Sequence, residues 1–344
     1  MFDFTTRVVP YLTPSEREEV VSLLSSSDLA FDEGADAVAL VEDTGGAVAA
    51  TASLFGSVIR MVAVSASCRE SGLSAVAISA LMEAARVGGV SRLFLYAKPD
   101  KAARFASLGF RNLAESGSAA LLETGEPGVG VYRKYLFEKR AAPDEATGGA
   151  PGKIGAIVAN CNPFTLGHRY LVERASSACR RLYVIVVEEN RSLFSFEDRY
   201  AMVEAGLSGF GNATLLRSGS YAVSDVTFPT YFLKDRSELA VASEQARLDL
   251  SLFCRLYAPA LGINARFVGT EPDSAVTRAY NEAMKDVLPA EGIEVVEVER
   301  LPAPDGAPIS ASAARRMMSS GDISKLSSYL PPSTIEYMRE KSLL

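Results

Sequence analysis

One short segment of this 344-residue chain holds the residues best suited to chemistry. His168, the only histidine, ends the run NCNPFTLGH at residues 160–168. Thr165 stands three positions earlier, so both side chains project from one side of a helical turn as hydrogen-bond donors. Gly167 lacks a Cβ and therefore lets an anion approach the backbone. These residue types at this spacing predict a phosphate site.

Two flanking elements must position these side chains. The apolar run 154–159 predicts a buried strand, and the amphipathic run 169–175 predicts a helix directly after the turn. The helix N-terminus then lies above the carboxyl end of a parallel sheet, where unpaired amides and the helix dipole attract phosphate. That dipole disfavours imidazolium and a bound polyphosphate favours it, so we expect the charge of His168 to depend on occupancy.

Two other interpretations of His168 remain open. A lone histidine is often a surface residue or a structural one. Cys161 flanks the same turn, so Cys161 and His168 could form a nucleophile and its base. No third group stands nearby to orient such a pair, and the phosphate site is the favoured interpretation.

A second segment near the C-terminus also suits an anion. Helix breakers within residues 302–308 precede Ile309 and Ser310, and Arg315 follows one turn after Ser312. A capping serine would bring a hydroxyl, free backbone amides and a guanidinium to one anion. Ordinary serine-capped helices share this pattern, so the segment gains its meaning from the first motif.

The two segments together resemble the signatures of the nucleotidyltransferase superfamily. Thr-x-Gly-His matches residues 165–168, and Ile-Ser-x-[Ser/Thr]-x-x-[Arg/Lys] matches residues 309–315. The superfamily includes pantetheine-phosphate and nicotinamide-mononucleotide adenylyltransferases and cleaves ATP between the α and β phosphates. The resemblance implies an α/β domain over residues 153–344 with a Rossmann-like, doubly wound parallel sheet.

Two further segments narrow this resemblance. A strand-like run at 182–187 leads to Phe-Ser-x-x-x-Arg, and Gly269-Thr270-Glu271 leaves another strand before a helix. With these segments the chain resembles the citrate lyase ligases, which acetylate the thiol prosthetic group of citrate lyase. Pantetheine-phosphate adenylyltransferases have arginine where this chain has Glu271, which weakens that alternative.

The N-terminal part carries a different pattern. The segment RESGLS at residues 69–74 follows a strand-like run and precedes a helical one. It resembles the acyl-CoA-binding turn of GNAT acetyltransferases, [Arg/Gln]-x-x-Gly-x-[Gly/Ala], with Ser74 in place of the last small residue. ARFASLGF at residues 103–110 resembles a later GNAT element. The resemblance implies a GNAT-like, mixed α+β domain over residues 1–140.

In such a domain, Arg69, Gly72 and Ser74 would bind a CoA-type pantetheine arm. No residue in this half is marked by its position as a catalytic base, so a docking domain and an acetyltransferase both remain open. Residues 141–152 are rich in Pro, Gly and polar residues and are predicted to link the two domains.

Composition limits the class of protein. The formal charge of −7 argues against broad binding to nucleic acid or to an anionic membrane. The four cysteines lie far apart, without metal-ligand spacing, and read as reduced thiols. No apolar run has the length of a membrane span. We therefore expect a cytoplasmic protein whose 48% hydrophobic residues fill two cores.

The ligase resemblance implies a two-step reaction. Acetate attacks the α-phosphorus of ATP to give acetyl-adenylate and pyrophosphate, and the phosphopantetheine-type thiol of the citrate lyase acyl carrier protein then takes the acetyl group. Mg²⁺ would accompany the triphosphate without a predicted protein ligand. The resemblance assigns catalysis to Thr165, His168, Ser312 and Arg315. It assigns ATP binding to Asn160, Cys161, Gly167, Gly269, Thr270, Glu271, Ile309 and Ser310.

Two other functions stay open at this point. One is a nucleotide adenylyltransferase with a phosphorylated acceptor, and the other is a non-catalytic regulator that binds ATP and an acyl carrier. Phosphorylated acceptors need a second basic cluster, which is not evident here, so acetate is favoured. The roles of Arg191, Arg199 and Lys234 are left open, and the aromatic segment 224–234 suits either a substrate wall or the core.

Overall fold

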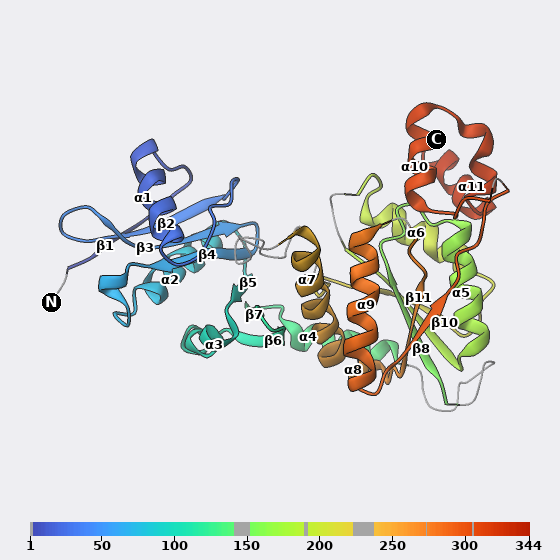
Figure 1. The fold of residues 1–344 in the computed structure, drawn as a ribbon, viewed down its shortest axis with the longest axis horizontal. Helices are drawn as coiled ribbons and strands as arrows, with labels where there is room; N and C mark the ends of the chain where they lie inside the picture. The colour runs from blue at the N-terminus through green and yellow to red at the C-terminus, as the bar shows by residue number, and fades with distance from the viewer. Residues whose placement is uncertain (1–2, 141–151, 189–191, 223–236, 273, 305) are drawn as a thin grey trace. The chain divides into compact units, whose positions relative to one another are not determined.

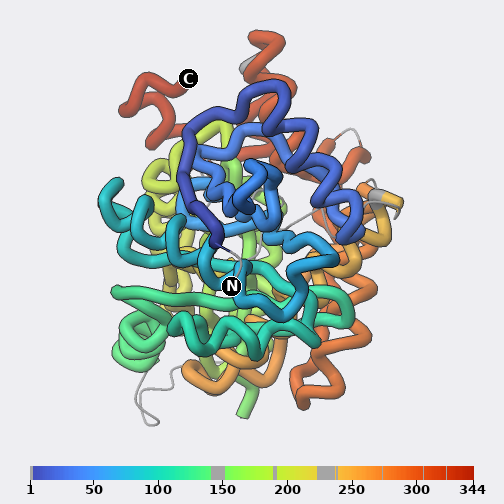
Figure 2. The backbone as a smooth tube through the Cα atoms, turned by 90° about the vertical axis from the view of Figure 1, so that its left-hand side faces the viewer, coloured from blue at the N-terminus to red at the C-terminus, as the bar shows by residue number. Residues whose placement is uncertain are grey.

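A computed structural model describes residues 3–140, 152–188, 192–222, 237–272, 274–304 and 306–344 (Figures 1 and 2). The chain divides into two compact units, the first formed by Met1–Arg133 and Asp225–Ser251 and the second by Lys134–Ser224 and Leu252–Leu344. Three features named above fall outside the described residues: nearly all of the predicted linker, Arg191, and the segment that carries Lys234.

Within the described residues, the first unit is built on a seven-stranded sheet of order β1-β2-β3-β4-β5-β7-β6. Neighbouring strands run antiparallel except β4 and β5, which are parallel. The strands are β1 Thr5–Val9, β2 Ala37–Glu42, β3 Val48–Phe55, β4 Val58–Val64, β5 Arg92–Ala97, β6 Arg111–Glu115 and β7 Ala120–Gly125. Its helices include α1 Pro14–Ser25, α2 Leu73–Val87, α3 Pro99–Ala102 and the start of α4 Val129–Lys139. This mixed α+β layout confirms the class predicted for the N-terminal part.

The strands β4 and β5 stay paired only over a short stretch. Val58 pairs with Phe94 and Ile59 with Leu95, and β4 continues to Val64 without a further partner in β5. The two strands therefore separate toward their carboxyl ends. Eight residues separate β4 from the helix α2, whose apolar residues, spaced three and four apart, pack on the sheet.

A helix from the C-terminal half of the sequence belongs to this first unit. Glu244 of α7 (Glu238–Leu252) accepts hydrogen bonds from the hydroxyls of Ser116, at 3.2 Å, and Ser118, at 2.6 Å. The backbone N–H of Glu115 donates to Ser251 Oγ at 3.2 Å. The predicted division is a single break at residues 141–152, which leaves α7 in the second domain. The bonds that join α7 to the first unit connect residues distant in sequence, and no local pattern predicts them.

The second unit, as far as the structure describes it, holds a five-stranded parallel sheet of order β10-β9-β8-β11-β12. Its strands are β8 Ile154–Ala159, β9 Arg181–Val186, β10 Ala213–Arg217, β11 Ala265–Gly269 and β12 Glu294–Val298. Its α-helices are α5 Leu166–Ala178, α6 Phe196–Leu207, α8 Ala258–Leu261, α9 Ala275–Ala290, α10 Ala311–Ser320 and α11 Pro332–Glu340. In Figure 1 the strands lie between α5 and α9.

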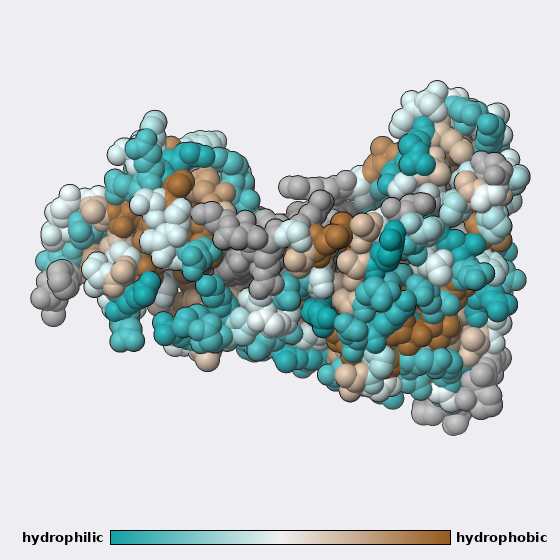
Figure 3. All heavy atoms as spheres, viewed as in Figure 1, coloured by the Kyte–Doolittle hydropathy of each residue, from teal (hydrophilic) through white to brown (hydrophobic). Residues whose placement is uncertain are grey.

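The strand order confirms the predicted doubly wound sheet. The chain moves outward from β8 through β9 to β10, then returns to the other side of β8 for β11 and β12. The order thus reverses between β8 and β11, the position at which open parallel sheets bind ligands beyond their carboxyl ends. Hydrophilic side chains predominate on the face of this unit seen in Figure 3. Among the described helices, none has the length and apolar character needed to cross a membrane.

Candidate active site

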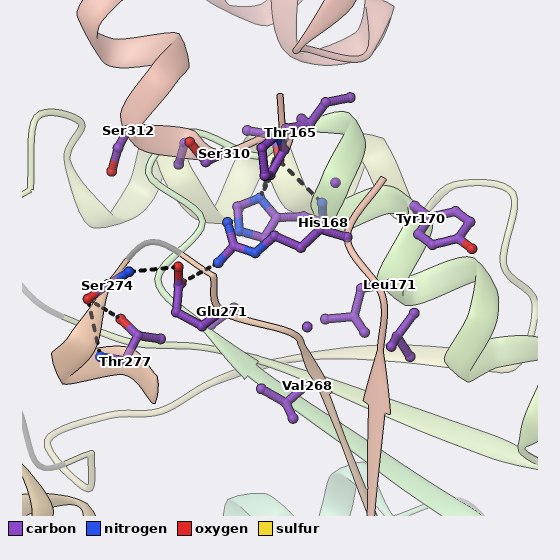
Figure 4. A pocket seen from close by; sticks show the side chains of 18 of the residues that line it. Thr165, His168, Tyr170, Leu171, Val268, Glu271, Ser274, Thr277, Ser310 and Ser312 are labelled. Carbon is purple, nitrogen blue, oxygen red and sulfur yellow. Dashed lines mark hydrogen bonds and ion pairs between the residues drawn. The ribbon is translucent and has the colours of Figure 1, made fainter. Parts of the chain in front are cut away.

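A pocket of about 820 Å³ opens beyond the carboxyl ends of β8, β11 and β12 (Figure 4). Its floor is apolar and includes Ile157 and Phe267 from the two central strands. Three helices begin at its wall, because the N-cap residues Thr165 of α5, Ser274 of α9 and Ser310 of α10 all line it. Three N-termini around one cavity at the switch point suit a polyanionic ligand.

Thr165 and His168 hold each other at the start of α5. The hydroxyl of Thr165 accepts the backbone N–H of His168 at 3.2 Å, and the backbone N–H of Thr165 donates to His168 Nδ1 at 3.0 Å. Histidine thus takes the place of the glutamate in a capping box. Because Nδ1 accepts a hydrogen bond, the neutral ring carries its proton on Nε2. Thr165 is 1% exposed, and its hydroxyl is engaged in capping α5.

The imidazole of His168 is neutral near pH 7. Burial lowers its pKa to about 4, and the positive charge of Arg300 contributes in the same direction. The ring also stacks on Phe164, with centroids 5.8 Å apart. In Figure 4 it lies between Thr165 and the loop that carries Glu271. Without a ligand, the ring is therefore a fixed, uncharged donor through Nε2–H.

Arg300 is a pocket residue that the sequence interpretation missed. It follows β12 and forms an ion pair with Glu271, which follows β11. Arg300 Nε also donates to the carbonyl of Thr270 at 2.6 Å, and Glu271 accepts the backbone N–H of Ser274 at 3.1 Å. The signal that could have found Arg300 is its place directly beyond the carboxyl end of a strand, where site residues of parallel sheets gather.

Gly167 brings the two sequence motifs together. A Cβ at this position would lie 2.9 Å from the carbonyl oxygen of Ile309, closer than side chains tolerate. The start of α5 therefore packs directly on the segment that leads into α10. The first motif favours glycine at position 167 because a phosphate could then approach the backbone. The structure shows a second requirement for glycine here, since a side chain would prevent the contact between the two motifs.

The C-terminal segment braces the turn of the first motif. The backbone N–H of Leu166 donates to the carbonyl of Tyr329 at 2.8 Å, and the hydroxyl of Thr334 donates to the carbonyl of Phe164 at 3.1 Å. Both bonds span more than 150 residues of sequence. The C-terminal helices thereby fix the backbone from which His168 projects.

Ser310 is the N-cap of α10, and Ser312 and Arg315 lie within the helix, as expected, but the three have different surroundings. Ser310 caps the helix by accepting the N–H of Ala313 at 3.1 Å, and Ser312 lines the pocket. Arg315 is directed elsewhere, since its Nη1 donates to the carbonyl of Asn162 at 2.5 Å. Burial, and then the charge of Arg316, lowers the pKa of Arg315. Arg316 lines the pocket and Arg315 does not.

Comparison with known proteins agrees with this geometry. Residues 154–338 match the family model described as the citrate lyase ligase C-terminal domain. The chain is 40% identical to the [citrate [pro-3S]-lyase] ligase of Klebsiella pneumoniae, over 84% of this chain and 82% of that protein. It is 34% identical to the enzyme of the same name from Escherichia coli K12, over 93% of this chain and 90% of that protein. The chain belongs to the citrate lyase ligase family.

Family membership makes the chain an acid–thiol ligase and implies the use of ATP. It favours neither the nucleotide adenylyltransferase nor the non-catalytic regulator. A solved acyl-CoA N-acyltransferase from Pseudomonas aeruginosa is also similar, at 18% identity and a TM-score of 0.31, over 36% of this chain and 100% of that one.

Cys161 of this ligase is placed away from its pocket. Its side chain is 3% exposed, and burial raises the pKa of the thiol to about 12. A thiol that stays protonated is a poor nucleophile, which disfavours the pairing of Cys161 with His168. Asn160 is exposed, and its side chain bonds to Ser192 and Arg199. Neither Asn160 nor Cys161 is among the described residues that line the pocket.

Arg199 joins the carboxyl ends of β8 and β9. It is fully buried, and its Nη1 donates to the carbonyls of Asn160, at 2.7 Å, and Val187, at 2.9 Å. Glu197, two residues before Arg199, pairs with Arg217 instead, at 2.8 Å. Arg199 therefore holds the two loops beside the pocket at a fixed separation.

The turn predicted to bind a pantetheine arm lies in the first unit. Gly72 is the N-cap of α2 and has a φ of 79°, a left-handed conformation that favours glycine. It offers no side chain to the first amides of the helix. Arg69 is exposed, three residues before Gly72, and Ser74 is partly buried in the first turn. Anion binding at this turn stays a prediction, and the uncapped start of α2 suits it.

The pocket does not provide a closed metal site. Within the described ranges, no three His, Cys, Asp or Glu side chains gather as metal ligands. Glu271 is engaged by Arg300 and by the N–H of Ser274. A Mg²⁺ ion that arrives with a nucleotide takes most of its ligands from phosphate and water, and the pocket is compatible with that arrangement.

Proposed function

We propose that this ligase activates acetate with ATP and transfers the acetyl group to the acyl carrier protein of citrate lyase. An acetate oxygen attacks the α-phosphorus, the bond from that phosphorus to the bridging oxygen of pyrophosphate breaks, and acetyl-adenylate forms. The thiol of the carrier's phosphopantetheine-type group then attacks the acetyl carbon, AMP leaves, and the thiol proton passes to water. The use of ATP and of a free thiol favours the cytoplasm as the compartment of this reaction.

The observation that carries this proposal is a neutral donor, His168, fixed in a pocket where three helices begin. His168 Nε2–H is directed by the bond between Thr165 N–H and Nδ1. It would donate to an oxygen of the α-phosphate, where negative charge grows in the transition state. Thr165 acts by holding the ring. A prepositioned neutral donor needs no proton transfer, which suits a reaction that depends on positioning and charge stabilisation.

The ends of the nucleotide are assigned from the walls of the pocket. Gly269 ends β11 and Glu271 lies two residues further on; both line the pocket and would border adenine and ribose, since the nearest atoms to a Cβ at Gly269 lie 4.0 Å away and leave room for a ligand. Thr270, between them, is not among the described residues that line the pocket. Ser310 and Ser312 would hold the leaving pyrophosphate with the first amides of α10. Mg²⁺, when bound with the triphosphate, would neutralise phosphate charge.

The first unit would receive the acyl carrier. Arg69, Gly72 and Ser74 surround the start of α2, beside strands that separate toward their carboxyl ends, and this arrangement suits a phosphate-bearing arm. Arg69→Ala should lower the rate of carrier acetylation at limiting carrier by about 10-fold, the scale of one charge-assisted contact. It should leave acetyl-adenylate formation unchanged. Equal loss of both activities would contradict a docking role.

Exchange of labelled pyrophosphate into ATP tests the central step. The exchange should require acetate, and neither pantetheine phosphate nor nicotinamide mononucleotide should replace it. Hydroxylamine should trap the activated acetyl group as acetohydroxamate. Exchange that depends on a phosphorylated acceptor instead of acetate would support an adenylyltransferase and overturn the proposal.

A further inference from the structure

Two adjacent arginines on α10 have different surroundings. Arg315 is directed to the turn of the first motif, where Nη1 donates to the carbonyl of Asn162 and Nη2 donates to Ser312 Oγ at 3.1 Å. A guanidinium that satisfies a backbone carbonyl fixes the turn, and releasing it to bind a ligand would leave that carbonyl without its partner. Arg315 is thus suited to positioning the turn.

Arg316, unlike Arg315, is among the residues that line the cavity. Its side chain is exposed to solvent, and no hydrogen bond or ion pair joins its guanidinium to any residue that the structure describes. Ser312 stands four positions earlier, so both side chains lie on the same face of α10. The Ser310 cap takes the N–H of Ala313, and the amides of Ala311 and Ser312 remain at the pocket wall.

A cation, a hydroxyl and free amides therefore gather at one side of the cavity. His168 lines the same cavity and has Nε2–H available as a hydrogen-bond donor. The charge of Arg300 is already balanced by Glu271, whereas the charge of Arg316 has no carboxylate partner among the described residues. An anion of more than one charge is the ligand that this side of the pocket favours.

We infer that Arg316, outside the recognised motif, binds the β and γ phosphates of ATP and the leaving pyrophosphate, and that Arg315 is a positioning residue acting through the Asn162 carbonyl. This inference rests on the proposed function, because it takes the ligand to be ATP. The motif marks only Arg315 as a phosphate ligand, whereas this inference gives that role to Arg316.

Calorimetric titrations of the full-length protein with ATP, inorganic pyrophosphate and AMP test the assignment. Arg316→Ala should weaken ATP and pyrophosphate binding by about 10-fold or more, with AMP affinity within about two-fold of wild type, because only the first two ligands carry the outer phosphates. Arg316→Lys should recover part of the loss, since a point charge replaces the planar guanidinium. Arg315→Ala should weaken ATP and AMP alike and lower the melting temperature.

Arg174→Ala is the matched control, because Arg174 is exposed on α5 and lies outside the pocket. It should bind all three ligands as wild type does. Normal ATP and pyrophosphate binding by folded Arg316→Ala, or an equal loss of AMP binding, would overturn the inference while leaving the proposed function intact. A wild-type protein that binds no ATP would overturn both.

Discussion

The backbone N–H of Thr165 points at Nδ1 of His168 across 3.0 Å, and this one bond decides which nitrogen of the ring faces a ligand. An imidazole that accepts at Nδ1 donates at Nε2. The bond also restricts the rotation of the His168 side chain, because the ring is held by the turn that it caps. The sequence motif specifies both partners three residues apart, and the turn specifies their geometry.

His168→Ala should lower acetate-dependent pyrophosphate exchange by about 100-fold or more, the usual cost of losing a preorganised charge-stabilising donor. ATP binding should weaken much less than turnover. Cys161→Ala is the control, since this buried thiol lies outside the pocket and its loss should leave exchange near wild type. Full activity in folded His168→Ala would remove the central role of the ring.

The single histidine makes the ionisation of the site directly visible by NMR. With a pKa near 4, the ring of His168 should show no titration between pH 8 and pH 5.5, and its nitrogen shifts should report the Nε2–H form. Titration centred near 6.5 in the ligand-free protein would contradict the buried, neutral ring.

The same shift predicts how stability depends on pH. The pKa of His168 is lowered on folding from 6.5 to about 4, so below pH 6.5 the unfolded chain binds a proton that the folded chain excludes. The contribution of the lowered pKa of His168 to the free energy of unfolding is fully present above pH 6.5 and is lost as the pH falls toward 4. Urea unfolding of wild type and His168→Gln at pH 7.5 and pH 5 should show a larger decrease for wild type. Equal decreases would argue against the shift.

Gly167→Ala tests the contact between the motifs. The added methyl group would lie 2.9 Å from the carbonyl oxygen of Ile309, and this backbone atom cannot move away by a change of rotamer. We expect a loss of about 1–3 kcal/mol in unfolding free energy, the range for overpacking, with reduced pyrophosphate exchange. Gly209→Ala adds the same group where no atom lies within 4 Å and should be neutral for both. A neutral Gly167→Ala would show that the two segments can separate at little cost.

Arg300→Met should both destabilise the protein and change the ionisation of His168. Glu271 is only 7% exposed and would lose its ion-pair partner, which we expect to cost about 3–5 kcal/mol in urea unfolding. Removing the nearby positive charge should raise the pKa of His168 part of the way toward its ordinary value, because burial remains the larger cause.

Adding Glu271→Gln to Arg300→Met should restore much of the stability and leave the pKa of His168 raised. This double variant separates the two effects, since the buried carboxylate is removed together with its partner. If the pKa of His168 measured by NMR is the same in wild type and Arg300→Met, Arg300 does not act on the ring.

Local sequence patterns were sufficient for several elements of this fold. The apolar run before the first motif forms β8, the capping residues Thr165 and Ser310 begin α5 and α10, and the turn at Gly72 begins α2. Each depends on residues within one or two turns of one another, and hydrophobic periodicity and capping preferences act over that range.

Other features depended on residues distant in sequence. Arg315 was expected at phosphate because Ser312 is its neighbour, yet its guanidinium meets the carbonyl of Asn162, which lies 153 positions away. Arg300 carries no motif and enters the pocket because β12 lies beside β11. The place of α7 in the first unit likewise rests on bonds to Ser116 and Ser118.

The sequence by itself determined the two motifs, the class of each sheet and the family of the ligase. Those properties follow from short-range chemistry, in which a residue's type and its spacing to near neighbours suffice. Only the tertiary structure decided the proton position on His168, the pairing of Glu271 with Arg300, and the different directions of Arg315 and Arg316. Burial, charge and packing partners come from the folded chain, and a side chain is directed by whichever of them lies within reach.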